Sequence, residues 1–118
     1  MLTLAPNTRV FLAVEPFDMR GSFRSLAGAA RALGLDPTDG HLYVFLSKRR
    51  NIAKVLLFDR SGWCVFMKRL ERGSFQLPDP GEQQQLVVDT ATLHLLLEGI
   101  DLRAPRRAWY RRGAARGS

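Results

Sequence analysis

The chain has 118 residues, of which 46% are hydrophobic and 25% are charged. This composition is typical of one globular domain, and the length is too short for two. No apolar run approaches the roughly 18 residues that span a bilayer, and the N-terminus has neither the positive leader nor the long apolar segment of a signal peptide. The single cysteine, Cys64, excludes an internal disulfide. We therefore expect a cytoplasmic protein with no membrane partner.

The net charge of +7 is unevenly distributed along the chain. Residues 48–72 contain eight Lys or Arg and two acidic residues, whereas residues 73–102 contain five acidic residues and no basic one. Residues 103–118 contain six Arg and no acidic residue. Two basic segments thus flank an acidic one, a segregation that favours a charged partner such as nucleic acid.

The first half of the chain predicts a strand, a helix and a second strand. Residues 8–14 are β-rich and apolar and are followed by Glu15-Pro16, which predicts a strand. Residues 22–33 show apolar positions at helical spacing, with Ser22 as the N-cap and Gly34 at the left-handed position after the last turn. A turn-rich segment then leads to a second strand over residues 41–49.

The second half predicts three more strands and a second helix. Strands over residues 52–59 and 63–70 are joined by a short turn, and a fifth, shorter strand is expected over 72–78. Residues 78–85 are a polar linker, and Asp89 can cap a helix that begins near Thr90 and ends before Gly99. The regular spacing of turns favours an antiparallel meander over parallel βαβ units.

The predicted fold class is α+β: a small antiparallel β-meander of four to five strands with two helices packed on it. We expect one domain over residues 1–102 and a disordered, Arg-rich tail over 103–118. The central strands are apolar on both faces, so either the second helix or a partner must cover the second face. In the hairpin of residues 54–72, the expected core residues are Val55, Leu57, Val65 and Met67 on one face, and Leu56, Phe58, Cys64 and Phe66 on the other.

Nothing in the sequence points to catalysis, a metal or a cofactor. The two histidines, His41 and His94, lie on different predicted elements; with one cysteine they cannot form a zinc site of the usual spacing. We expect a hydrogen-bonded structural role for His41 and partial burial for His94. No phosphate-binding or nucleophile motif is present, and several Asp residues lie in predicted turns, where Asp favours local hydrogen bonds. A nuclease remains the least favoured of three alternatives.

The basic residues are the candidate DNA-binding residues. In the hairpin region they can form a positive rim at one end of the sheet; in the tail, Arg residues surround Trp109 and Tyr110, which combines phosphate contacts with base stacking. The alternative for the tail is a solvated segment without a partner. For Lys48-Arg49-Arg50 the alternative is a polar hairpin turn that keeps the edge of the sheet soluble. The candidates are Lys48, Arg49, Arg50, Lys54, Lys68, Arg69, Arg72, Arg106, Arg107, Arg111 and Arg112.

The sequence also shows a resemblance to a known family. From about residue 8 to 102, the chain resembles the TnpB-type accessory protein encoded by the second open reading frame of the insertion-sequence-66 family of transposable elements. The resemblance rests on the corner Pro16, Asp18, Met19 and Arg20, on Gly40-His41-Leu42, on the strand from Lys54 to Asp59, and on the helix end from Leu96 to Asp101. It also includes Gly62, Lys68-Arg69-Leu70-Glu71, Gly73, Phe75 and Pro78.

The resemblance implies a non-catalytic protein that assists a separate, element-encoded transposase. The family pattern often has Lys after the Met-Arg pair, where this chain has Gly21. This difference removes one positive charge and weakens the case for a phosphate contact at the corner. It favours a structural role for Met19-Arg20 there, with Asp18 capping or pairing with Arg20.

Two hypotheses follow. In the first, the protein binds DNA, non-specifically or at the element ends, through its basic surfaces while assisting the transposase. In the second, it is an interaction module that docks on the transposase or self-associates as a homodimer without contacting DNA. The second rests on the leucine-rich helix, whose candidate partner-binding residues are Leu93, Leu96, Leu97 and Ile100.

Overall fold

The computed structural model describes residues 7–102 of the chain. These residues form five strands and two helices, in the order β1, α1, β2, β3, β4, β5, α2. Their bounds are β1 Arg9–Ala13, α1 Phe23–Ala32, β2 Leu42–Leu46, β3 Ile52–Asp59, β4 Gly62–Arg69, β5 Gln85–Asp89 and α2 Thr90–Leu97. The predicted α+β class is confirmed.

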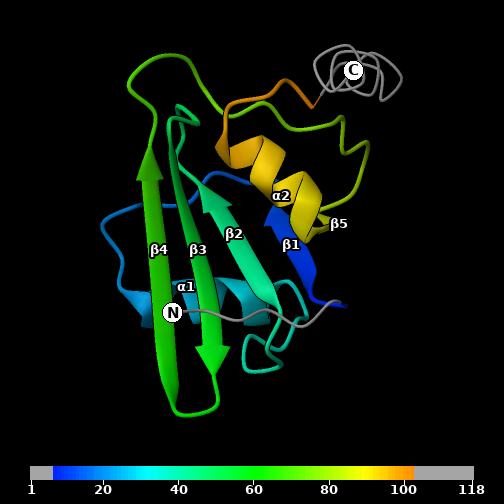
Figure 1. The fold of residues 1–118 in the computed structure, drawn as a ribbon. Coiled ribbons are helices and arrows are strands. Elements are labelled where there is room, and N and C mark those ends of the chain that lie inside the picture. The colour runs from blue at the N-terminus through cyan, green and yellow to red at the C-terminus, as the bar shows by residue number, and fades with distance from the viewer. Residues whose placement is uncertain (1–6, 103–118) are drawn as a thin grey trace, which may run out of the picture.

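The five strands form one sheet in the order β4-β3-β2-β1-β5 (Figure 1). Strands β2, β3 and β4 form the expected antiparallel meander. The predicted antiparallel pairing was wrong for β1 and β2, which pair in parallel. On its other side, β1 pairs with β5 in antiparallel orientation. The segment between β1 and β2 is therefore a crossover that contains α1, because two parallel strands cannot be joined by a tight turn.

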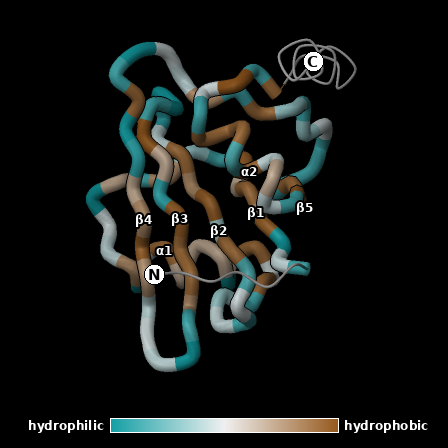
Figure 2. The backbone as a smooth tube through the Cα atoms, in the orientation of Figure 1, coloured by the Kyte–Doolittle hydropathy of each residue, from teal (hydrophilic) through white to brown (hydrophobic). Residues whose placement is uncertain are grey.

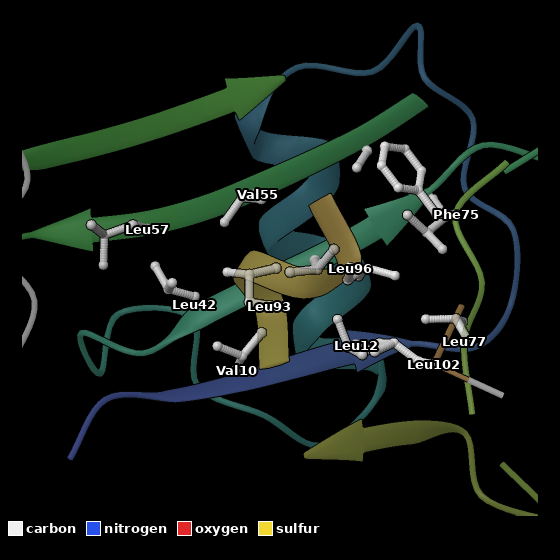
Figure 3. Packing of buried hydrophobic residues seen from close by; sticks show 13 residues of the cluster. Val10, Leu12, Leu42, Val55, Leu57, Phe75, Leu77, Leu93, Leu96 and Leu102 are labelled. Carbon is white, nitrogen blue, oxygen red and sulfur yellow. The ribbon is translucent and has the colours of Figure 1, made fainter. Parts of the chain in front are cut away.

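The two helices cover opposite faces of the sheet, α2 in front and α1 behind in the view of Figure 1. Side chains alternate along β2, so Tyr43 and Phe45 pack towards α1, while Leu42, Val44 and Leu46 pack towards α2. This arrangement explains why β2 is buried on both faces. The helix α2 thus supplies the second cover that the sequence required; Figure 3 shows Leu93 and Leu96 over the side chains of β1, β2 and β3.

The local signals at the ends of the helices act as expected. The Ser22 side chain accepts a hydrogen bond from the Arg24 amide, and the Asp89 side chain accepts one from the Thr92 amide. Gly34 and Gly99 follow the helices with φ angles of +80° and +81°, a conformation that costs glycine little.

The predicted fifth strand over residues 72–78 was wrong. The segment has no regular structure, but Phe75 is completely buried and Leu77 nearly so, and both belong to the core under α2. The Phe75 amide donates to the Arg50 carbonyl at 2.6 Å, which ties the segment to the end of the β2–β3 hairpin. The fifth strand instead begins at Gln85, the last residue of the expected linker, and its partner β1 is more than 70 residues away in sequence.

The predicted core faces of the β3–β4 hairpin were partly wrong. Leu56 lies opposite Val65, and Val55 lies opposite Phe66; residues directly opposite one another share a face, so Val65 shares a face with Leu56 and not with Val55. Val65, Phe66 and Met67 are also exposed, at 43%, 50% and 57%, because β4 is an edge strand that neither helix covers along its whole length.

The two histidines differ in their surroundings. The Arg9 amide donates to His41 Nδ1 at 3.0 Å, which confirms a structural hydrogen bond for His41. His94 lies on the outer side of α2 and is exposed, so the expected burial of its side chain was wrong.

The corner between β1 and α1 is held by local and distant contacts. The Phe17 amide donates to the Leu46 carbonyl at 2.9 Å. The Arg20 guanidinium donates through two nitrogens to the two carboxylate oxygens of Asp18, and the Arg20 amide donates to Asp18 as well. These hydrogen bonds stabilise the charged carboxylate and lower the pKa of Asp18 from 3.8 to about 2.

The first prediction concerns this pairing. Because the hydrogen bonds from the Arg20 side chain are the largest cause of the shift, Arg20→Ala should raise the pKa of the Asp18 carboxyl towards 3.8. The folded pKa is the depressed one, so the pairing stabilises the corner above pH 3.8 and is lost as the pH falls through about 2. Carboxyl carbon chemical shifts in an NMR titration measure this change; Arg24→Ala is the control and should leave Asp18 unaffected.

The second prediction concerns the irregular segment. Phe75→Ala removes a fully buried ring and should lower the free energy of unfolding by about 3–5 kcal/mol. Val87→Ala, at a position that is 55% exposed on β5, should lower it by less than about 1 kcal/mol. Urea unfolding followed by circular dichroism compares the two variants; equal losses would mean that Phe75 is not part of the core.

Candidate nucleic-acid interface

The β2–β3 turn presents two cations at one end of the sheet. The Arg50 amide donates to the Ser47 carbonyl at 2.8 Å, and the Ser47 amide donates to the Ile52 carbonyl at 2.9 Å. The Ser47 hydroxyl also accepts from the Ile52 amide. These bonds close the turn, with Arg50 at a φ of +57°, and leave the side chains of Lys48 and Arg49 exposed at its tip. Figure 2 shows this turn as hydrophilic, beside two hydrophobic strands.

The end of β4 brings a third cation to the same place. Arg69 lies opposite Ile52 in the β3–β4 register, and the Leu70 amide donates to the Asn51 carbonyl at 2.8 Å. Arg69 is therefore next to the β2–β3 turn although it is about 20 residues further along the chain. The predicted convergence of the hairpin ends is confirmed for this residue.

A surface hollow connects these cations with the β1–α1 corner. Its lining includes Lys48, Arg49 and Arg69 from the hairpins, and Asp18 and Met19 from the corner. Phe17, Ser47, Asn51 and Ile52 complete the lining. We call this feature the basic hollow. It joins the rim predicted from charge to the corner that carries the family pattern, two features that the sequence treats as separate.

Lys54 has a structural role beside the hollow. Its ammonium donates to the Met19 carbonyl at 2.7 Å and to the Gly21 carbonyl at 3.2 Å. Its side chain is half-buried and fastens the corner to the centre of β3. A phosphate would have to compete with both carbonyls for this ammonium, so Lys54 is a poorer candidate for DNA contact than its charge suggested.

The other predicted DNA-binding residues do not all face the hollow. Lys68 lies opposite Ala53, whose side chain belongs to the core under α2, so Lys68 is on the other face of the sheet from Arg69. Arg72 is exposed after the end of β4, and Arg50 is half-buried; neither lines the hollow. The tail candidates Arg106, Arg107, Arg111 and Arg112 lie outside the described residues, as does the predicted disorder of residues 103–118.

The balance of charge at the hollow is positive. Three cationic side chains line it together with one carboxylate, that of Asp18, and this carboxylate is already paired with Arg20 at 2.8 Å. The arrangement suits an anion with several oxygens spaced along a surface, such as a nucleic-acid backbone. Within residues 7–102, no three His, Cys, Asp or Glu side chains form a group that could hold a metal ion.

The leucine-rich helix offers less surface than expected. Leu93 and Leu96, at 6% and 0% exposure, pack into the protein's own core. A partner could reach them only by displacing α2 from the sheet, so these two proposed partner-binding residues are core residues in this fold. Leu97 and Ile100 are half-buried and are the remaining candidates on this helix and its end.

Some site residues were missed by reasoning from the sequence. The polar pair Ser47 and Asn51 closes the turn through the Ser47 hydroxyl, which donates to the Asn51 side chain at 3.1 Å. The small polar residues on either side of a basic triplet were the available signal, because Ser and Asn favour turns. The contact between Lys54 and the corner had no comparable signal, since it joins residues more than 30 positions apart.

Comparison with known proteins places the chain in a family. Residues 8–107 match the model of the IS66 Orf2-like protein family. The uncharacterized protein y4hO of Sinorhizobium fredii is 41% identical over 110 residues, which cover 92% of this chain and 95% of that protein. The uncharacterized protein y4jC of the same organism is 30% identical over 102 residues, 86% of each chain. No solved structure matches.

Neither helix in residues 7–102 is long and apolar enough to cross a membrane. The match over residues 8–107 contains the whole described fold from β1 to α2, including the corner and the basic hollow. The chain therefore belongs to the IS66 Orf2-like family, whose members have an accessory role in the transposition of insertion sequences.

Proposed function

We propose that this protein is a non-catalytic accessory factor that binds the DNA backbone through the basic hollow while it assists the element's transposase. The observation that carries the proposal is the convergence of Lys48, Arg49 and Arg69 beside the family corner. Three cations from two hairpins at one end of a rigid sheet form a surface on which phosphates can be bound without folding a new structure.

The hollow favours contact with phosphates over the reading of bases. Arg and Lys contacts to phosphate position a protein on DNA but carry no direct sequence information. Within residues 7–102, α2 contains no Arg, Asn or Gln, and α1 contains two such residues, the exposed Arg24 and Arg31, fewer than the three or four side chains with which a helix in the major groove reads bases. We therefore expect similar affinities for the element ends and for random duplexes of equal length when the transposase is absent.

Association with the transposase is the second half of the proposal. Its support is the family's accessory role, and the remaining candidates on the α2 side are Leu97 and Ile100. An interaction module that never contacts DNA is the competing function, and binding measurements with purified components separate the two.

The third prediction tests the hollow. Replacing its three cations by Gln, in the triple variant Lys48→Gln, Arg49→Gln and Arg69→Gln, should weaken duplex binding by more than about tenfold at low salt. The slope of log K against log salt should become shallower by about 2.7, since each lost phosphate contact contributes about 0.9. Fluorescence anisotropy with a labelled duplex at several salt concentrations measures both quantities.

A matched control separates local contacts from net charge. The triple variant Arg9→Gln, Arg24→Gln and Arg31→Gln removes three exposed cations elsewhere on the fold and gives the same net charge, +7 less 3. It should keep most of the affinity and the salt slope. If both triple variants lose binding equally, the hollow is not the binding surface. If neither binds less than the parent, the hollow does not contact DNA.

The fourth prediction concerns the Arg-rich tail. If the six Arg of residues 103–118 contact phosphates, their deletion should make the salt slope shallower by about 5. The same anisotropy titration measures this effect, with the tail deletion compared with the full chain and with the hollow variant. An unchanged slope would restrict DNA binding to residues 1–102.

Transposase binding is measured separately, by capture of the purified transposase in nuclease-treated buffer. The proposal expects capture by the parent and by the hollow variant alike, because DNA and transposase use different surfaces. Capture by the parent together with no DNA affinity would support the interaction module instead.

A further inference from the structure

The outer edge of β4 is long and open. All eight residues of β4 pair with β3 in unbroken register, from Ile52 opposite Arg69 to Asp59 opposite Gly62, and β4 contains no Pro. Among residues 7–102, no strand pairs with its other side, because β4 is the first strand in the sheet order (Figure 1). Proteins usually protect such an edge with a bulge, a proline or inward charges, and none of these devices interrupts residues 63–67.

The side chains along this edge are apolar on both faces of the sheet. Val65 and Met67 are 43% and 57% exposed on the α1 face, and Phe66 is 50% exposed on the α2 face. Only the start of the strand is covered, where the Trp63 ring stacks on Phe23 of α1 with a centroid distance of 5.8 Å. Three consecutive large apolar residues on an exposed edge form an apolar patch, and such patches typically mark a surface that binds a partner.

The backbone pattern determines which groups of β4 face outwards. The Leu70 amide donates to the carbonyl of Asn51, the residue directly opposite. Since hydrogen-bonded and non-hydrogen-bonded pairs alternate along an antiparallel ladder, residues 68, 66, 64 and 62 direct their backbone groups towards β3. The N–H and C=O groups of Trp63, Val65, Met67 and Arg69 therefore face the open side.

We propose that a second copy of this chain pairs with this edge, β4 against β4 in antiparallel orientation, with the two-fold axis at Phe66. In this register Val65 is hydrogen-bonded to Met67 of the other copy, and Trp63 to Arg69. All four outward-facing residues of each strand then find partners. The two Phe66 side chains face each other in a non-hydrogen-bonded pair, where cross-strand side chains are closest.

The charges of β4 favour this occupant. The cations Lys68 and Arg69 lie at one end of an otherwise uncharged strand. In the antiparallel register they face Cys64 and Trp63 of the other copy, so no cation within the paired strands lies opposite another, and Arg69 meets an aromatic ring, a favourable neighbour for a guanidinium. The chain's own tail, with six Arg and no acid, would instead bring further positive charge to this end.

A two-fold dimer leaves no β4 edge open for further growth. A two-fold pairing buries both β4 edges and leaves only the five-residue β5 strands at the outside. Pairing of β4 with β5 of the next copy would instead continue without end. The proposal therefore predicts a single species with twice the 13.3 kDa chain mass.

The fifth prediction tests the edge in the full chain without DNA. Sedimentation or light scattering should give a dimer that dissociates on dilution. Val65→Pro removes an outward-facing N–H without disturbing the β3 ladder, and it should raise the dimer Kd by more than about tenfold. The matched control is Val87→Pro on β5. The Val14 amide donates to the Gln84 carbonyl, so the same alternation makes the N–H of Val87 face outwards; this variant should remain dimeric.

A cross-link tests the register independently of any proline effect. In a Cys64→Ala background, Phe66→Cys places two thiols opposite each other and should give a disulfide-linked dimer on mild oxidation. Val65→Cys in the same background should not, because its two copies are offset along the strands beyond disulfide reach. A parent that is monomeric at all concentrations, open-ended assemblies, a Val65→Pro variant as dimeric as the parent, or cross-linking at position 65 in preference to 66 would each overturn the proposal.

Discussion

The position of β1 between β2 and β5 is the constraint on which the rest of the fold depends. β1 is hydrogen-bonded on both sides, in parallel to β2 and antiparallel to β5. The parallel pairing makes α1 cross one face of the sheet. The antiparallel pairing brings the chain back at Asp89, and α2 begins at the next residue and covers the other face. Each helix is thus placed by one side of β1.

The burial of β2 follows from the same constraint. With a helix on each face, a strand in the middle of the sheet has no wet side, and all five residues of β2 are buried. The pattern of an uninterrupted apolar run is therefore a consequence of position in the sheet. Tyr43 has the only side chain of β2 with a polar group. Its hydroxyl is hydrogen-bonded to the Asp36 carbonyl and the Asp39 carboxylate. This contact fastens the loop between α1 and β2 to the sheet.

The basic hollow is built where three segments meet at one end of this sheet. The β2–β3 turn, the end of β4 and the β1–α1 corner converge there, and Lys54 joins the corner to β3 through two carbonyls. Lys54 therefore has a structural role, because it links the corner to the sheet. The cations Lys48, Arg49 and Arg69 are exposed and face solvent. Lys54 is structural because its ammonium lies within hydrogen-bond distance of two backbone carbonyls of the corner.

Local sequence determined most elements of this protein. Ser22, Asp89, Gly34 and Gly99 mark the helix ends through hydrogen bonds and backbone conformations that involve only near neighbours. The hairpin from β3 to β4 could be predicted for the same reason, because its turn and its two apolar runs are adjacent. The segregation of positive charge also belongs to the sequence, and it indicated the end of the hairpin where the hollow lies.

Only the tertiary structure decided the contacts between distant segments. The parallel pairing of β1 with β2, the strand at Gln85–Asp89 and the burial of Phe75 all depend on partners far along the chain. Periodicity cannot identify such partners, since an apolar run is the same in a central strand, an edge strand or an irregular core segment. For that reason the sequence placed Phe66 in the core and Lys54 on the surface, whereas the order of strands exposes Phe66 and directs Lys54 to the corner.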